Sequence, residues 1–288
     1  MKTRIIFFGT PHFVLPVLDT LFDKFDLVGV VTAPDAPVGR GEVLTSSPVK
    51  KRAQELSSDI QIFTPGKLDA TFVQMLQTCN AELFVTAAYG KIIPSSVLSL
   101  PLHGSLNIHP SLLPKLRGPS PIQTALLEGI SQSGITIIKM DEKMDHGPIV
   151  AQWEYTFHDE DTFKSLQDKM FLNAAEKIPQ VIEDLLTQKI TPLDQNENQA
   201  TYCQMITKHN GFIDLSSPPE KQTLKRMIRA YYPWPGVYTK IRTTQGEKIL
   251  KLLPDNKVQV EGKNIVSVGD FFNGYPELKP ELEGLLLE

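Results

Sequence analysis

The first thirty residues alternate short apolar runs with a helical pattern, which restricts the chain to a parallel α/β sheet. Arg4–Phe8 (RIIFF) is apolar and ends at Gly9, and this predicts a buried strand. Phe13–Phe22 carries apolar residues at helical spacing, and Leu27–Val31 is a second buried strand. A strand, a helix and a strand over this length form the βαβ unit of a parallel sheet.

The same alternation continues to about residue 186 and predicts a Rossmann-like, mostly parallel sheet with helices on both faces. Further strands are expected at Ile60–Phe63, Leu83–Ala88, Ser105–Ile108, Gly134–Met140 and Ile149–Thr156. Further helices are expected at Lys50–Leu56, Asp69–Gln77, Pro121–Glu128 and Asp161–Leu186. Between them, Ala33–Pro48 is rich in proline and glycine, which predicts a long loop of the kind that is more often functional than idle.

The pattern changes after a polar, unpatterned stretch, Gln188–Asn198, which we interpret as the start of a linker. A helix is expected at Glu220–Tyr231. Short β-rich runs follow at Gly236–Arg242, Glu247–Leu252, Lys257–Val260 and Asn264–Val268. We predict a catalytic domain over 1–188, a linker over 189–204, and over 205–288 a small β-barrel domain of the OB type, or an antiparallel sheet.

Composition excludes several classes of protein. With 41% apolar and 22% charged residues the chain is of the globular type, and its net charge of −4 gives no overall basic field for nucleic acid. Cys79 and Cys203 form no CxxC pair, so neither a disulfide scaffold nor a zinc site is expected. We expect no bound metal, no membrane span and no targeting segment, and therefore a cytoplasmic protein.

Polar residues follow the strand at Ser105–Ile108, at the edge of a parallel sheet where ligands bind. Asn107 and His109 are two apart on an extended chain, so their side chains point to the same side. Pro110 supports this because it holds the preceding residue in the extended region. One amide and one imidazole at one spot suit acyl transfer, because both can donate to a developing oxyanion.

A carboxylate near the histidine could orient it and help move a proton, and Asp145 is the candidate. Since an attacking amine is itself the nucleophile, no reactive Ser or Cys is required. Two alternatives stay open from the residues alone. His103 or His146 could be the working histidine, and Asp141 and Asp145 could be turn residues that bond local backbone.

Seven stretches of the chain resemble the folate-dependent formyltransferases, and in particular the methionyl-tRNA formyltransferase family, over nearly the full length. They are IIFFGTPHF (5–13), TAPDAPVGRG (32–41), SPVK (47–50), AAYGKIIP (87–94), LNIHPSLLPKLRGPSPIQ (106–123), GITIIKMDEKMDHGPI (134–149) and IRAYYPWPG (228–236). The resemblance implies that Asn107, His109 and Asp145 are catalytic. It also implies a cis peptide bond at Leu113–Pro114.

The formyl donor that the resemblance implies is 10-formyltetrahydrofolate, bound by turns around Ala88–Ile93 and Lys139–Gly147. The residues expected to bind it are Ala88, Tyr89, Gly90, Ile93, Ser111, Leu112, Leu113, Pro114, Met140 and Asp141.

Formyltransferases of this type act on glycinamide ribonucleotide, sugar nucleotides or methionyl-tRNA, and the catalytic motif does not separate them. Two features favour the α-amino group of initiator methionyl-tRNA. Arg40 lies between two glycines in the long loop, where it can reach a phosphate or a base edge. Residues 201–259 hold ten basic and four acidic side chains, a net charge of +6.

The residues expected to contact tRNA are Arg40, Lys221, Lys225, Arg226 and Arg229, and we expect a monomer. The main alternative acceptor is an amino-sugar nucleotide. A hydrolase that releases formate, or a non-catalytic binding module, fits less well. Three departures from the family pattern concern Leu116, where an aromatic residue is common, Glu42–Val43, where basic residues are usual, and a short C-terminal domain.

Overall fold

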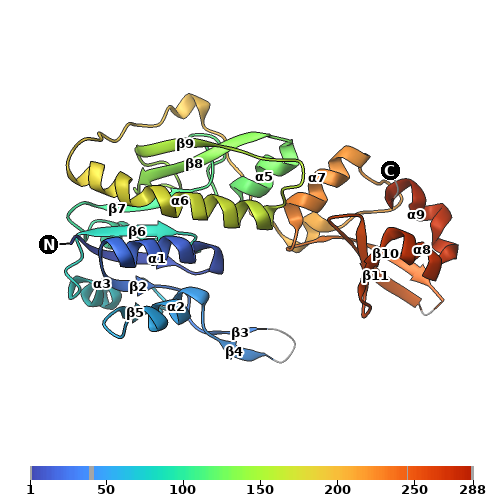
Figure 1. The fold of residues 1–288 in the computed structure, drawn as a ribbon, viewed down its shortest axis with the longest axis horizontal. Helices are drawn as coiled ribbons and strands as arrows, with labels where there is room; N and C mark the ends of the chain where they lie inside the picture. The colour runs from blue at the N-terminus through green and yellow to red at the C-terminus, as the bar shows by residue number, and fades with distance from the viewer. Residues whose placement is uncertain (1, 39–41, 245, 287–288) are drawn as a thin grey trace. The chain divides into compact units, whose positions relative to one another are not determined.

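The larger part of the molecule is built on a seven-stranded sheet with the order β5-β2-β1-β6-β7-β8-β9 (Figure 1). This is a computed structural model, and it describes residues 2–38, 42–244 and 246–286. The strands are β1 Arg4–Gly9, β2 Asp26–Val31, β5 Gln61–Phe63, β6 Leu83–Ala87, β7 Ser105–His109, β8 Gln132–Lys139 and β9 Ile149–Thr156. The expected strands are all present, with ends that differ by a few residues.

The first five strands in the sheet order pair in parallel, and β8 runs antiparallel to β7. The chain builds outward from β1 through β2 to β5 and then returns to β6 on the other side of β1. The carboxyl ends of β1 and β6 therefore flank a topological switch point, where ligands bind in such sheets. There the Thr10 hydroxyl donates to the carbonyl oxygen of Tyr89 at 3.1 Å.

Helices cover both faces, as predicted. Alternation along β1 sends Ile6 and Phe8 into a buried cluster with residues of α3 (Ala70–Gln77) and α4 (Ser95–Leu98). Ile5 and Phe7 point to the opposite face and are also fully buried. The remaining helical segments of this part are η1 His12–Val14, α1 Leu15–Lys24, α2 Pro48–Leu56, α6 Phe163–Leu186 and η2 Glu197–Gln199. The Thr162 hydroxyl caps α6 by accepting from the Ser165 amide.

The long loop predicted over Ala33–Pro48 contains two short strands that the sequence did not predict. β3 (Ala36–Val38) and β4 (Val43–Thr45) pair antiparallel as a hairpin, with Ala36 opposite Thr45. Pro37 is normally evidence against a strand. In a two-stranded ribbon, however, both strands are edge strands, where proline is tolerated. Arg40 lies outside the described residues.

The second unit contains 119–132, 156–166 and 203–288. Its four-stranded antiparallel sheet, in the order β10-β11-β12-β13, confirms the predicted β-rich domain and is consistent with a small barrel. The strands are β10 Val237–Thr243, β11 Gly246–Leu253, β12 Lys257–Val260 and β13 Ile265–Ser267. Its helical segments are α5 Pro121–Glu128, η3 Lys208–Gly211, α7 Lys221–Tyr231, α8 Val268–Gly274, η4 Pro276–Leu278 and α9 Lys279–Leu286. The last three were not predicted, because glycine and proline interrupt their pattern.

Most of the segment predicted as a linker over 189–204 packs on the first unit. Leu193 forms a β-bridge with Ile149, and Tyr202 forms one with Arg117. Among the helices described, none has the length and apolar character needed to cross a membrane.

Candidate active site

Strand β7 places Asn107 and His109 on the same side, as its two-residue alternation requires. The Asn107 amide nitrogen donates to Oδ1 of Asp145 at 3.3 Å. Nδ1 of His109 lies 3.5 Å from the same oxygen. Two side-chain nitrogens thus converge on one oxygen atom, and the structure brings the three predicted catalytic residues together.

Asp145 lies in the turn between β8 and β9 and has a left-handed backbone, with φ of 51°. Its Oδ2 accepts a hydrogen bond from the Gly118 amide at 2.8 Å. Only 11% of its side chain is exposed. Both carboxylate oxygens are therefore held, one by backbone and one by the two catalytic candidates.

The ring of His109 is fixed at both nitrogens. Nε2 lies 3.0 Å from the carbonyl oxygen of Leu116, and because a carbonyl can only accept, Nε2 donates. Nδ1 is left to face the Asp145 carboxylate. A neutral imidazole in this tautomer and an ionised carboxylate would present two lone pairs to each other, so the pair is suited to hold one proton between them.

The two alternative histidines are placed elsewhere. His103 precedes β7 at the amino end of the strand, where its backbone amide donates to Glu82. Nδ1 of His146 is 2.6 Å from Asp141, and its Nε2 is 3.5 Å from Glu197. The geometry therefore favours His109 as the working histidine.

The turn that follows β7 is anchored on the neighbouring strands. The Thr136 hydroxyl donates to the carbonyl of Ser111 and accepts from the Leu113 amide. The Gln152 amide donates to the carbonyl of Leu113 at 2.9 Å. The Leu113–Pro114 peptide bond is cis, which confirms that expectation. Ser111 and Leu113, both predicted to bind the donor, are buried and use these backbone groups within the fold.

Other predicted donor-binding residues come together from two turns, the one after β6 and the one after β8. Tyr89 and Ile93 belong to the cluster under α3 and α4, and Met140 packs against it. Ala88 and Gly90 have left-handed backbones and are exposed after the end of β6. Leu112 lies instead against the backbone of Gly134.

The Tyr89 hydroxyl is buried and has no hydrogen-bond partner among the described residues. The residue as a whole is only 4% exposed. Burial raises the pKa of this phenol to about 12. The hydroxyl is therefore neutral at physiological pH and retains its capacity to donate. An unsatisfied buried polar group beside a functional site is a reason to expect a ligand that pairs with it.

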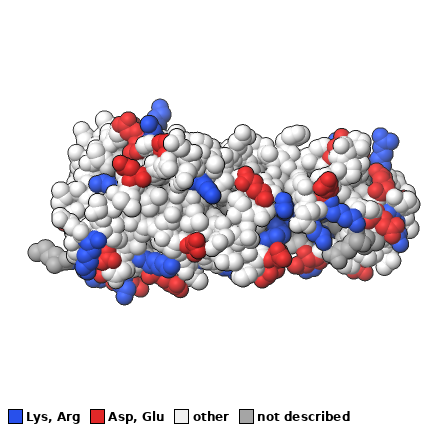
Figure 2. All heavy atoms as spheres, turned by 90° about the horizontal axis from the view of Figure 1, so that it is seen from above, with Lys and Arg blue, Asp and Glu red and all other residues white. Residues whose placement is uncertain are grey.

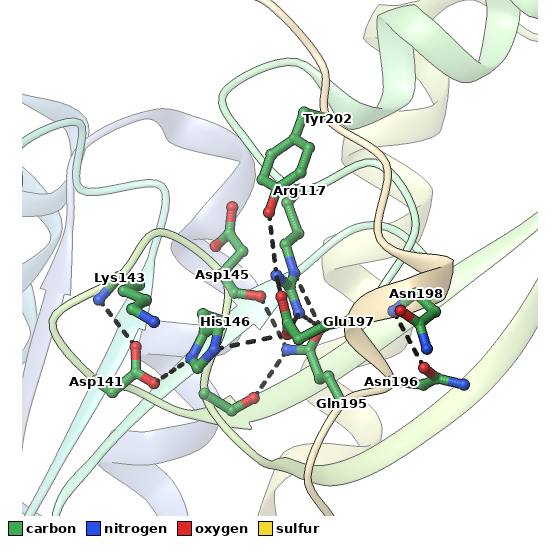
Figure 3. Close-up of polar contacts among 11 residues, drawn as sticks. Arg117, Asp141, Lys143, Asp145, His146, Gln195, Asn196, Glu197, Asn198 and Tyr202 are labelled. Atoms are coloured by element: carbon green, nitrogen blue, oxygen red, sulfur yellow. Dashed lines mark hydrogen bonds and ion pairs between the residues drawn. The ribbon is translucent and has the colours of Figure 1, made fainter.

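Residues that the sequence did not identify surround the Asp145 turn (Figure 3). The Arg117 side chain is 1% exposed and forms a bidentate pair with Glu197, at 3.0 and 2.6 Å. This guanidinium holds the pKa of the Glu197 carboxyl below its usual range. Gln195 bonds both Arg117 and the turn. The polar sequence around Gln195 and Glu197 does not differ from that of a linker. Their partner Arg117 lies about eighty residues earlier in the chain, so the sequence gives no local sign of the contact.

No group of three or more His, Cys, Asp or Glu side chains suited to a metal occurs in the part of the chain that the structure describes.

The basic residues of α7 differ in exposure. Lys221 and Lys225 are exposed, whereas Arg226 and Arg229 are half-buried. The Arg229 guanidinium donates to the carbonyls of Asp161 and His158, each at 2.7 Å. The Arg226 guanidinium lies against Gly129. The two arginines thus have structural contacts within their own unit. On the face shown in Figure 2, basic side chains lie interleaved with acidic ones.

The sequence profile described as "Formyl transferase" matches residues 1–182, and that described as "Formyl transferase, C-terminal domain" matches residues 205–257. The chain belongs to the formyl transferase family. This formyl transferase is 42% identical to the methionyl-tRNA formyltransferase of Listeria monocytogenes over 82% of its own length and 75% of the relative. It is 39% identical to the enzyme of the same name from Listeria welshimeri, over 92% and 84% of the two chains.

Solved structures share the fold of this formyl transferase. A 4-N formyltransferase from Francisella tularensis has a TM-score of 0.66 at 20% identity and covers 88% of this chain and 96% of its own. A methionyl-tRNA formyltransferase from Clostridium thermocellum has a TM-score of 0.59 at 18% identity, with coverage of 92% and 100%. Leu116, a departure from the expected family pattern, contacts His109 through its backbone carbonyl oxygen and not through its side chain.

Proposed function

We propose that this formyl transferase moves a formyl group from 10-formyltetrahydrofolate to the α-amino group of initiator methionyl-tRNA. The observation that carries the chemistry is the convergence of the Asn107 amide and the His109 ring on Oδ1 of Asp145. The observation that favours the acceptor is the identity of about 40% to relatives named methionyl-tRNA formyltransferase.

The proposed reaction is a direct attack of the amine on the formyl carbon. A new N–C bond forms, the carbonyl oxygen becomes an oxyanion, and the bond to N10 of the folate then breaks. Asn107 is the proposed donor for the oxyanion, and Nδ1 of His109 joins it when that atom holds the proton shared with Asp145, because both nitrogens face the same spot. The amine loses a proton and N10 gains one, and the His109–Asp145 pair is suited to hold it between the two steps.

The donor site is proposed to lie between the turn after β6 and the end of β8. Exposed backbone at Ala88 and Gly90 can approach a planar ring closely, and the apolar side chains of Ile93 and Met140 lie nearby. The unpartnered Tyr89 hydroxyl supplies a polar contact. These groups fit a flat, polar-edged molecule such as a reduced pterin.

The tRNA contacts are proposed to come from Arg40 and from the exposed lysines of α7, Lys221 and Lys225. Cationic side chains of this kind bind the phosphate backbone without reading sequence. An amino-sugar nucleotide remains the alternative acceptor, although a sugar N-formyltransferase among the solved structures shares only the fold, at 16% identity. A monomeric state and a cytoplasmic location are part of the same proposal.

Acceptor identity can be tested by incubating the purified protein with 10-formyltetrahydrofolate and either methionyl-tRNA or a 4-amino sugar nucleotide. Formation of acid-stable formylmethionyl-tRNA is expected. Transfer to the sugar alone would replace the leading proposal with the alternative, and release of formate alone would indicate a hydrolase.

A further inference from the structure

The turn that carries Asp145 is tight and packs closely against the end of β8. Asp145 has a left-handed backbone, which is uncommon outside glycine, although aspartate tolerates it better than most residues. Two residues later, a side chain at Gly147 would overlap the carbonyl oxygen of Lys139. The position of the Asp145 carboxylate follows the backbone of this turn, so contacts that hold the turn also hold the carboxylate.

Gln195 makes those contacts with a single amide group. Its Nε2 donates to the carbonyl oxygens of Asp145 and Gly147, each at 2.8 Å. Its Oε1 accepts from Nε and Nη2 of Arg117, at 3.1 and 2.8 Å. Every N–H of the amide and both lone pairs of its oxygen are thus used, so the orientation of the amide is fixed.

Arg117 connects this amide to the rest of the site. The residue before it, Leu116, accepts from His109, and the residue after it, Gly118, donates to Asp145. Its buried guanidinium is held by the bidentate pair with Glu197, as Figure 3 shows. One anchored arginine therefore lies between the two backbone groups that orient the proton-holding pair.

We infer that Gln195 is a positioning residue for Asp145: anchored by Arg117 and Glu197, it holds the 145–147 turn so that the carboxylate stays within reach of His109. The inference rests on the proposed formyl transfer. Loss of the amide should lower kcat, because small misplacements of a catalytic group are costly, and should leave binding of both substrates nearly unchanged.

Gln195→Met tests this, since it keeps the volume of the side chain and removes its hydrogen bonds. We expect kcat to fall about tenfold or more, with both KM values changed by less than about twofold. Asn198→Ala is the matched control, an exposed amide three residues further on, and should keep the wild-type kcat. If Gln195→Met does not fold, Gln195→Glu serves instead, because it can still pair with Arg117 but turns an acceptor towards two carbonyls.

The decisive comparison is the same substitution in an Asp145→Asn background. If Gln195 acts through Asp145, the double variant should be no slower than Asp145→Asn alone within about twofold. A full multiplicative loss in the double variant, or an unchanged kcat in Gln195→Met, would overturn the inference. If the wild type transfers the formyl group, neither of these two outcomes affects the proposed function. If the wild type shows no transfer, both the proposed function and the inference about Gln195 are overturned.

Discussion

Nδ1 of His109 lies 3.5 Å from Oδ1 of Asp145, and each residue has a second contact that fixes its orientation. The ring cannot rotate without losing the Leu116 carbonyl, and the carboxylate cannot rotate without losing the Gly118 amide. The two groups are therefore organised before any substrate binds, which is the condition for efficient proton handling during catalysis.

Asp145→Asn should lower kcat by about 10²- to 10⁴-fold, because the side chain keeps its shape but loses the charge that holds the proton. KM for methionyl-tRNA should change little. Steady-state kinetics with the exposed Asp59→Asn as control would check this. A loss confined to KM would assign Asp145 to binding instead.

Asn107→Ala and His109→Ala should each lower kcat by about two to three orders of magnitude, the usual effect of removing one oxyanion donor. His103→Ala is the control, because His103 lies at the opposite end of β7. Near-normal turnover in either variant would remove that residue from the proposed mechanism.

Tyr89→Phe should raise KM for 10-formyltetrahydrofolate about three- to tenfold, the equivalent of one neutral hydrogen bond. The thermal midpoint should stay the same or rise, because the variant removes a buried hydroxyl that has no partner among the described residues. Tyr238→Phe, in the second unit, provides the control. An unchanged KM would place the donor away from this hydroxyl.

Lys221→Ala and Lys225→Ala should each weaken tRNA binding and reduce the slope of log K against log salt by about one unit. Arg229→Ala should instead lower the thermal midpoint, because its guanidinium bonds two backbone carbonyls. Binding measured between low and high salt separates these effects. Equal salt slopes in the wild type and the lysine variants would contradict phosphate contacts there.

The Arg117–Glu197 pair should stabilise the protein in a pH-dependent way. Arg117 lowers the pKa of Glu197 from its ordinary value of 4.5, so the folded state binds this proton less tightly than the unfolded state. The contribution is present above 4.5 and is lost as pH falls through the folded value. Glu197→Gln should therefore lower the thermal midpoint at neutral pH, with the difference shrinking on acidification. A constant difference, or the same effect in exposed Glu176→Gln, would contradict this.

Sequence reasoning identified the elements whose signal is local. The apolar run Arg4–Phe8 and the two-residue spacing of Asn107 and His109 can be recognised without knowledge of any distant partner, and the structure confirms both strands. The hairpin at Ala36–Thr45 was missed because Pro37 is normally evidence against a strand.

The anchoring of the Asp145 turn could not be predicted for a different reason. Gln195 and Glu197 acquire their roles from Arg117, some eighty residues earlier, and a polar segment without periodicity does not indicate its partners. A buried arginine requires an acceptor, but the sequence does not say which one. The same limit applies to Arg226 and Arg229. Their positive charges led to the prediction of tRNA contacts, and the sequence did not indicate the contacts that they make within the protein.

The central claim is tested most directly by the ratio of kcat/KM for methionyl-tRNA to that for a 4-amino sugar nucleotide, measured with the same 10-formyltetrahydrofolate and the same enzyme preparation. Formyl transfer to methionyl-tRNA that exceeds transfer to the sugar by about 10³-fold or more is expected, because specificity reflects differential binding of the transition state. A ratio at or below one would contradict the proposed function.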